Sequence, residues 1–228
     1  TLAAGLVWGG MVGWVAAGLR RRGVRVPYTR KTFHFGIFTG AAVIHALGGL
    51  PATVAYGTAV AGLVLLAVAR GQGSGLYEAL ARETDRPRRS LFIVVPLLTT
   101  AVGGLLSALM AGPFAAVGYL VAGWGDAVGE PVGARWGRHT YRVPSLGGVP
   151  ATRSWEGSAA VLAASWLAAW GALAALGASW GEALAVGAAV SAVATVVEAF
   201  SPHGTDNLTV QMVASAVALW LTGPGAGG

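Results

Sequence analysis

The chain contains no cysteine and carries little charge. Without cysteine it can form neither a disulfide framework nor a thiolate metal site. Only 11% of its 228 residues are charged, whereas a soluble domain usually carries about 25%. Hydrophobic residues make up 55% of the chain and the mean hydropathy is positive. The composition therefore excludes an ordinary soluble domain and predicts an integral membrane protein.

Lysine is almost absent as well, because Lys31 is the single lysine among fifteen basic residues. The bases fall in three short polar stretches, residues 20–31, 70–89 and 135–153, each between hydrophobic segments. Short loops rich in arginine and lysine stay on the cytoplasmic side of a membrane. Orientation and anionic lipid headgroups thus explain the net charge of +6, and we do not expect the protein to bind nucleic acid.

Eight hydrophobic segments approach the length of a membrane span, about twenty residues. The turns between several of them carry no basic residue and should face away from the cytoplasm. We therefore predict an all-α, polytopic membrane helix bundle of about eight transmembrane helices, a single domain over residues 1–228. Both termini should lie outside and the active site should face the cytoplasm, while the sequence leaves open whether the bundle forms a homodimer. The segments are 1–19, 33–50, 51–69, 90–112, 113–136, 157–177, 183–201 and 207–222.

Two carboxylates interrupt the fifth hydrophobic segment. Asp126 and Glu130 are four residues apart, hence on one helical face, and Pro131 should break or kink the helix beside them. A charge inside a membrane span costs about 2.5 to 3.5 kcal/mol, so such residues usually face a polar cavity and have a function. The alternative is that glycines at the same spacing only permit helix packing and that Glu130 pairs with Arg135 or Arg138.

The following loop, residues 138–158, combines arginines, hydroxyl groups and the paired glycines Gly147 and Gly148 before a predicted helix start at 156–158. Arginine side chains and the N–H groups of a helix start bind polyphosphates. Carboxylates of the preceding helix could hold a divalent cation that bridges those phosphates. Taken alone, a basic loop of this kind is also explained as a topology signal.

Other polar positions have two interpretations each. His34 fits either a phosphate contact or the membrane interface, and Glu198 either the site or an ion pair with a loop arginine. In the second basic loop, one of three arginines could close over a nucleotide, or the loop could be a short interfacial helix with a solvated charged face. These arginines are Arg86, Arg88 and Arg89.

The order of these motifs resembles a known family. Gly125-Asp126, Gly133 and Gly137, followed by RSWEGS at 153–158, resemble the signature shared by CTP-dependent polyprenol and phytol kinases, dolichol kinase and the yeast-type CTP-dependent diacylglycerol kinase. RKTFH at 30–34 resembles the N-terminal element of that family, and DNLTV at 206–210 its C-terminal element. The resemblance covers nearly the whole chain. Phosphatidate cytidylyltransferases are more distantly similar.

The resemblance implies a kinase that uses CTP and Mg2+ to phosphorylate a lipid alcohol of the phytol, geranylgeraniol, polyprenol or dolichol type. Asp126 would be the principal metal ligand, Asp206 the second and Glu130 a supporting one, and either aspartate could accept the alcohol proton. Lys31 and Arg153 would complete the catalytic set by holding the phosphates. The implied nucleotide-binding residues are Lys31, His34, Gly133, Gly137, Arg138, Arg153, Ser154, Glu156, Gly157, Ser158 and Asn207.

Three positions depart from the family pattern: Arg153 replaces the usual lysine, Glu156 the alanine of phytol kinases, and Gln211 a proline. Arg153 keeps the positive charge, but its planar guanidinium, which donates several hydrogen bonds in fixed directions, replaces the compact ammonium group of lysine. Glu156 favours a rival function, a cytidylyltransferase in which a lipid phosphate attacks the α-phosphorus of CTP, whereas the elements at 30–34 and 206–210 favour the kinase. A membrane transporter or lipid scaffold is a second rival, although no inverted repeat appears in the two halves.

Overall fold

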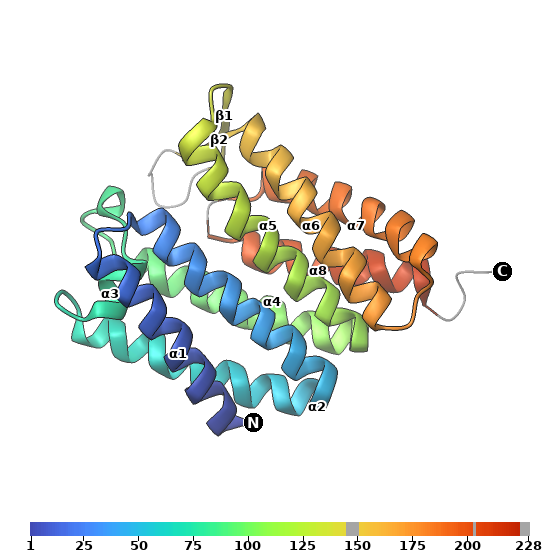
Figure 1. Ribbon diagram of the computed structural model, residues 1–228, viewed down its shortest axis with the longest axis horizontal. Coiled ribbons are helices and arrows are strands. Elements are labelled where there is room, and N and C mark those ends of the chain that lie inside the picture. Colours follow the sequence, from blue (N-terminus) through green and yellow to red (C-terminus); the bar gives the residue numbers. More distant parts are fainter. Residues whose placement is uncertain (145–150, 203, 224–228) are drawn as a thin grey trace.

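The computed structural model describes residues 1–144, 151–202 and 204–223, so the paired glycines at 147–148 lie outside the described residues. The described chain forms a bundle of long helices with one small hairpin (Figure 1). In chain order the elements are α1 (Leu2–Arg21), α2 (Val26–Arg70), α3 (Gly75–Leu80), η1 (Glu83–Asp85), α4 (Leu91–Ala111), η2 (Gly112–Phe114), α5 (Ala115–Trp136), β1 (Thr140–Val143), β2 (Ala151–Ser154), α6 (Trp155–Ala175), α7 (Trp180–Phe200) and α8 (Asp206–Thr222).

Helix α2 consists of two arms joined by a sharp bend. Gly49 has φ 61° and ψ −154°, a conformation that is open essentially only to glycine. The arms before and after it turn back beside each other (Figure 1), and the Tyr56 hydroxyl donates a hydrogen bond across them to the Ile37 carbonyl at 2.9 Å. Helices α4 and α5 are joined by a similar turn at Gly112, with φ 53°. The chain therefore turns where adjacent hydrophobic segments were predicted to meet.

Within the described residues, five helical stretches are long and apolar enough to cross a membrane: Leu2–Arg21, Val26–Arg70, Leu91–Trp136, Trp155–Ala175 and Trp180–Phe200. Two of these contain the turns at Gly49 and Gly112, and α8 is shorter, with 17 residues. The structure thus supports a helical membrane protein. The number of eight crossings, the side that the basic loops face and the location of the termini remain predictions.

The all-α prediction missed a hairpin in the third basic loop. Strands β1 and β2 pair antiparallel, with Thr140 opposite Ser154 and Val143 opposite Ala151. Strands of four residues are too short for an alternating pattern to stand out in a sequence. Strand β2 runs directly into α6, and Ser154 caps that helix because its Oγ accepts a hydrogen bond from the Gly157 N–H at 3.1 Å.

Small residues let α5 lie close against α6. A Cβ atom on Gly125 would fall 2.5 Å from Ser165 Oγ, and one on Gly129 only 2.3 Å from Val161 Cγ2. These glycines therefore act in packing, as one of the sequence interpretations expected. Helix α5 continues past Pro131 to Trp136, so the proline does not break the helix. The packing leaves the carboxylate face of α5 free to meet the first arm of α2.

Candidate active site

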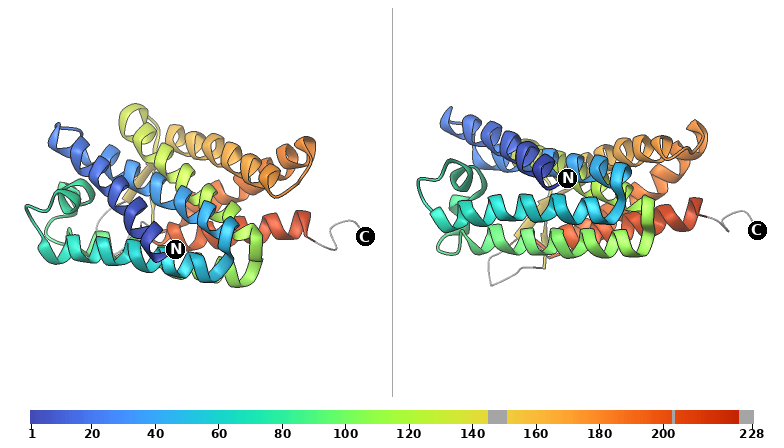
Figure 2. Two further views of the ribbon diagram at one scale, coloured as in Figure 1. Left: turned by 60° about the horizontal axis from the view of Figure 1, so that its bottom comes forward. Right: turned by 90° about the horizontal axis from the view of Figure 1, so that it is seen from below.

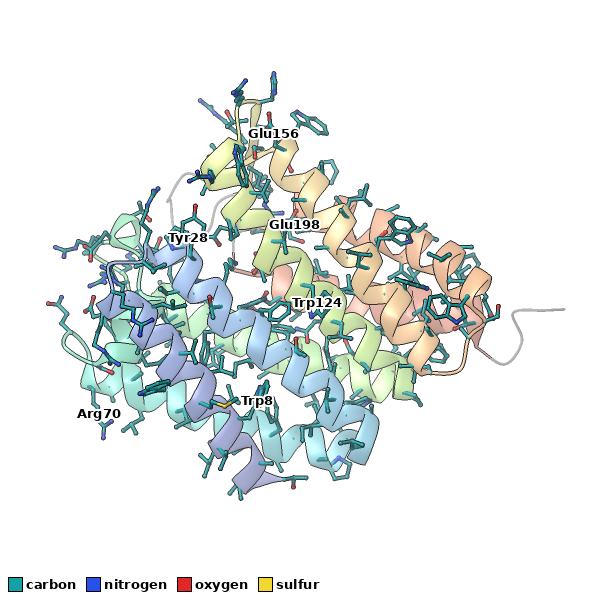
Figure 3. The ribbon with its side chains drawn as sticks, in the orientation of Figure 1. Trp8, Tyr28, Arg70, Trp124, Glu156 and Glu198 are labelled. Carbon is teal, nitrogen blue, oxygen red and sulfur yellow. The ribbon has the colours of Figure 1, made fainter. Side chains whose placement is uncertain are left out.

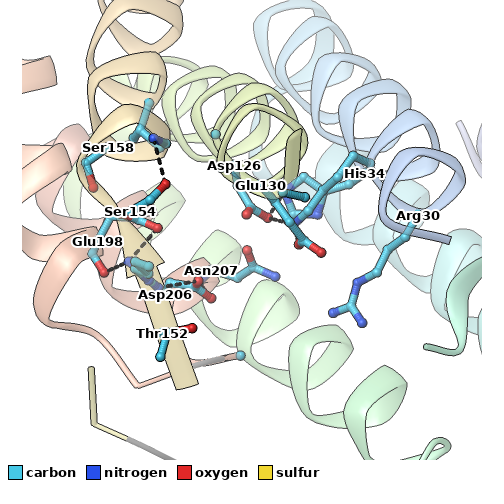
Figure 4. Close-up of a pocket in the computed structure, with 18 of the residues that line it drawn as sticks. Arg30, His34, Asp126, Glu130, Thr152, Ser154, Ser158, Glu198, Asp206 and Asn207 are labelled. Carbon is cyan, nitrogen blue, oxygen red and sulfur yellow. Dashed lines mark hydrogen bonds and ion pairs between the residues drawn. The ribbon is translucent and has the colours of Figure 1, made fainter. Parts of the chain in front are cut away.

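A polar cavity of about 300 Å³ lies where the start of α2 meets α5, β2 and the start of α6. The end of α7 and the start of α8 complete its wall (Figure 4). Segments from both ends of the chain thus meet at one place. The predicted site residues that line the cavity are Lys31, His34, Asp126, Glu130, Gly133, Arg153, Ser154, Gly157, Ser158, Asp206 and Asn207.

Lys31 holds the two carboxylates of α5 together. Its Nζ lies 2.5 Å from Asp126 Oδ2 and 2.8 Å from Glu130 Oε2, and only 6% of its side chain is exposed. One lysine reaches both because the two carboxylates, one helical turn apart, share a face. Glu130 also pairs with Arg82 at 3.2 Å. The predicted alternative partners of Glu130, arginines on its own helix and the following loop, are therefore wrong.

His34 (Figure 4) lies one turn of α2 beyond Lys31 and, like it, lines the cavity next to Asp126. Its Nε2 is 3.3 Å from Asp126 Oδ2, and this buried nitrogen makes no hydrogen bond within the described residues. The ring rests against Phe38, with centroids 4.4 Å apart. Of the two interpretations of His34, the structure supports a place in the site rather than at the membrane interface.

Glu198 and Asp206 lie across the cavity from Asp126 and Glu130 (Figure 4), and Arg153 forms a second cluster with them. Its guanidinium pairs with Glu198 and lies 3.1 Å from Asp206 Oδ2. Burial alone would lower the pKa of Arg153, but the two carboxylates outweigh that effect and raise the pKa above its usual value. Glu198 combines both of its predicted roles, because it pairs with a loop arginine and also lines the cavity.

The start of α6 presents small polar groups to the cavity. Ser158 Oγ lies 2.7 Å from the Tyr141 hydroxyl of β1, and Ser154 Oγ caps the helix. A Cβ on Gly157 would fall 3.1 Å from both the Gly129 carbonyl oxygen and Ser154 Oγ, a tight contact, so glycine favours this close approach of α6 to α5. The positive end of this helix dipole lies next to basic side chains, which suits an anion, although the Trp155 N–H already donates to the His139 carbonyl and the Gly157 N–H to Ser154 Oγ.

Three predicted nucleotide-binding residues do not line the cavity: Gly137, Arg138 and Glu156. Glu156 pairs with His139 at 2.7 Å beside the hairpin, away from Glu198 (Figure 3). Arg138 is exposed to solvent. A Cβ on Gly137 would fall 2.6 Å from Ser154 Oγ, so the glycine makes room for the helix cap. Contacts of these residues with a nucleotide are expectations that this geometry does not favour.

Arg82 and Arg30 line the cavity although neither was among the predicted site residues. Arg82 Nη1 reaches Glu130, and Arg30 Nη1 donates to the Phe92 carbonyl at 3.2 Å. Arg30 lies in the RKTFH element, next to Lys31, and could have been included on that ground. Arg82 is 48 positions from its carboxylate partner, so no local pattern signals it.

The arginines that were considered as a closing group lie elsewhere. Arg86 pairs with Glu83 at 2.7 Å on the exposed surface. Arg89 is buried between Glu78 and Glu83, at 3.1 Å from each. Neither of them, nor Arg88, lines the cavity. The second basic loop contributes to the cavity through Arg82 instead.

A divalent cation would find oxygen ligands in the cavity. Within the described residues, no three histidine, aspartate or glutamate side chains are grouped closely enough to hold a metal by themselves. Asp126 is neutralised by Lys31 and Asp206 by Arg153. Because Mg2+ usually binds one or two carboxylates and completes its shell with water and substrate phosphates, this donor set fits the ion together with a nucleotide.

Comparison with known proteins gives one informative similarity. Over 125 residues the chain is 38% identical to the phytol kinase of Synechocystis sp., a match that covers 53% of this chain and 51% of that protein. The chain thus spans about half the length of the curated relative that it matches. No protein-family model and no solved structure matches the chain. The similarity supports a relation to kinases of the phytol and polyprenol type, in a helical membrane protein.

Proposed function

We propose that the protein is a CTP-dependent kinase that transfers the γ-phosphoryl group to the hydroxyl of a long-chain isoprenoid alcohol. The observation that carries the proposal is the polar cavity, in which four cationic side chains and four carboxylates from distant segments meet inside an apolar helical bundle. The cations are Arg30, Lys31, Arg82 and Arg153, and the carboxylates are Asp126, Glu130, Glu198 and Asp206. The similarity to a phytol kinase supports the acceptor class, and the motif resemblance supports CTP.

The residues of the cavity suit phosphoryl transfer, in which a protein mainly positions its substrates and neutralises charge. Lys31 would contact the phosphates as a point charge, and Arg153 as a planar fork beside the start of α6. The alcohol oxygen attacks the γ-phosphorus, the bond from that phosphorus to the bridging oxygen breaks, and CDP leaves. The alcohol proton passes to Asp126 or Asp206.

Asp126 and Asp206, with Glu130 in support, are the residues that would hold Mg2+. The bound ion would neutralise charge that develops on the phosphate oxygens. Lys31 pairs with Asp126 and Arg153 with Asp206. With Mg2+ held by these carboxylates, the two cationic side chains would contact phosphate oxygens instead. The protein's own ion pairs thus keep the cavity neutral before the substrates bind.

The proposal is tested with purified protein in lipid nanodiscs, Mg2+ and CTP labelled on its γ-phosphate, together with phytol and geranylgeraniol. Label is expected in a lipid monophosphate, with CDP as the second product, and Asp126→Asn should abolish the transfer. ATP in place of CTP measures nucleotide preference. Label released only as pyrophosphate would contradict the kinase and indicate the cytidylyltransferase. Glu156, which favoured that rival, lies outside the cavity, so no structural observation favours it.

A further inference from the structure

A second cavity, of about 370 Å³, lies beside the polar one. It runs between the two arms of α2 and against α4, with Tyr119 of α5 and Gln211 of α8 at its back. The two tyrosine hydroxyls of its wall are already satisfied, since Tyr56 donates to Ile37 O and Tyr119 to Gly104 O. Away from the end that it shares with the polar cavity, most of the surface that it offers to a ligand is therefore apolar.

The two cavities adjoin each other. Arg30, His34, Pro96 and Asn207 line both of them. A molecule with a polar head and an apolar chain could place its head among the charged groups while its chain stays in the second cavity. The change from polar to apolar lining occurs at His34 and Asn207, so a hydroxyl group at the head of such a molecule would lie beside these two residues.

The apolar cavity opens sideways through the wall of the bundle. The second arm of α2 and helix α4 run side by side (Figure 2). Between them, the lining residues Val54 and Leu105 are 49% and 43% exposed, and Gly57 and Ala101 are exposed as well. Because this outer surface is apolar, it would contact lipid chains in a membrane. A lipid could therefore enter from the bilayer without crossing water.

The shape of the cavity suits an extended chain. Along the first arm of α2 its lining extends from Arg30 to Ala41, about 16 Å at the helical rise of 1.5 Å per residue. This is about half of the roughly 30 Å hydrocarbon core of a bilayer. Leu50, beside the bend of α2, lines the far end. The cavity thus reaches from the charged groups toward the middle of the bundle.

We propose that the apolar cavity binds the isoprenoid chain of the acceptor alcohol, which enters between the second arm of α2 and α4 and presents its hydroxyl beside His34 and Asn207. This inference rests on the proposed function and adds where the acceptor binds and how it arrives. It also assigns a specificity role to Gly57. Gly57 lines the cavity at an exposed position, and nothing lies within 4 Å of a Cβ atom added there. A larger side chain would therefore fill part of the proposed binding space without pushing neighbouring protein atoms aside.

The test compares Gly57→Leu with Gly62→Leu. Gly62 lies on the same arm of α2, is exposed, also has open space at its Cβ, and does not line the cavity. Each protein is irradiated in nanodiscs with a geranylgeraniol analogue that carries a diazirine near the end of its chain, without nucleotide, and the labelled peptides are identified. Phosphorylation of geraniol and geranylgeraniol is measured in parallel.

Wild type and Gly62→Leu are expected to be labelled on the second arm of α2 and on α4. Gly57→Leu should lose most of this labelling, and its kcat/KM for geranylgeraniol should fall about tenfold, as when about two methylene groups lose their apolar contacts, with little change for geraniol. Equal labelling of both variants, or labelling spread over the outer helices as for adsorbed bilayer lipid, would overturn the chain site while leaving the kinase intact. Labelling in the cavity without phosphorylation of any alcohol would instead overturn the kinase.

Discussion

At the scale of single residues, Lys31 has an unusual place. It is the only lysine of the chain and is buried between two carboxylates of another helix. A buried ion pair contributes little net stability by itself, but removal of one partner leaves the other charge uncompensated. Under the proposed function, Lys31 would act both in the fold and on a phosphate, and a single substitution would not separate these roles.

A double variant separates the structural role of Lys31 from its proposed role in phosphate binding. Lys31→Met is expected to destabilise the protein by about 2 kcal/mol, because Asp126 and Glu130 lose a charge partner and keep only about a fifth of their surface exposed. Lys31→Met combined with Asp126→Asn should recover about half of this loss, yet remain inactive. Unfolding in mixed detergent and γ-phosphoryl transfer measure the two effects. A double variant as unstable as the single one would show that charge imbalance is not the cause.

Arg153 allows a conservative test in the second cluster. Arg153→Lys should keep activity but raise the KM for CTP about tenfold, because an ammonium replaces a fork that contacts both Glu198 and Asp206, and a charged hydrogen bond is lost. Arg138→Lys is the matched control, since Arg138 belongs to the same loop but lies outside the cavity. The comparison requires only initial rates over a range of CTP concentrations. An equal effect of both substitutions would argue that general loop charge, rather than the cluster, binds CTP.

The sequence indicated much of the site at this scale because its motifs are short and local. Asp126 and Glu130 share a face by their spacing, and the one-turn interval between Lys31 and His34 places both on one wall of the cavity. The pairing of Arg82 with Glu130 could not be predicted, since it depends on how the second basic loop folds over α5. Glu156 resembles a motif residue, but its helix position turns it toward His139.

At the scale of elements, the bend of α2 brings together two walls of the apolar cavity, and α4 supplies another. His45 fixes this bend, with Nδ1 2.9 Å from Thr53 Oγ1 beyond the bend and Nε2 2.9 Å from the Gly112 carbonyl at the α4–α5 turn. The two turns are therefore tied to each other. Hydrophobic segmentation predicted where the chain turns, but not this link, because hydrogen bonds between turns leave no periodic pattern.

Two glycine-to-alanine substitutions test how much the bend of α2 depends on the backbone conformation of Gly49. Gly49→Ala should destabilise the protein by about 1 to 3 kcal/mol, because alanine is strained at φ 61°. Gly62→Ala, in a regular part of the same helix with open space around it, should be neutral or stabilise by up to about 1 kcal/mol. Unfolding midpoints in one detergent give the comparison. If both alanines stabilise the protein, the bend does not require glycine.

At the scale of the whole molecule, the proposed function requires the fold to bring a water-soluble nucleotide together with a lipid alcohol from the membrane. The basic loops and the polar cavity share one end of the bundle, and the apolar cavity extends from there between helices that face lipid. Composition and charge pattern predicted the helical membrane class and the polar end. The apolar cavity could not be predicted, since it depends on the angle at which the arms of α2 meet α4.

The complete absence of cysteine makes the orientation directly measurable. Single cysteines at Arg22, Arg70 and Arg142 should react with a membrane-impermeant maleimide only from the cytoplasmic side, because each replaces a residue of a basic stretch. A cysteine at Leu47, 81% exposed beside the bend of α2, should react only from the opposite side. The cysteine-free parent supplies the unlabelled control. If Arg22→Cys and Arg70→Cys react from opposite sides, α2 crosses the membrane once rather than twice, and the count of eight spans with both termini outside is wrong.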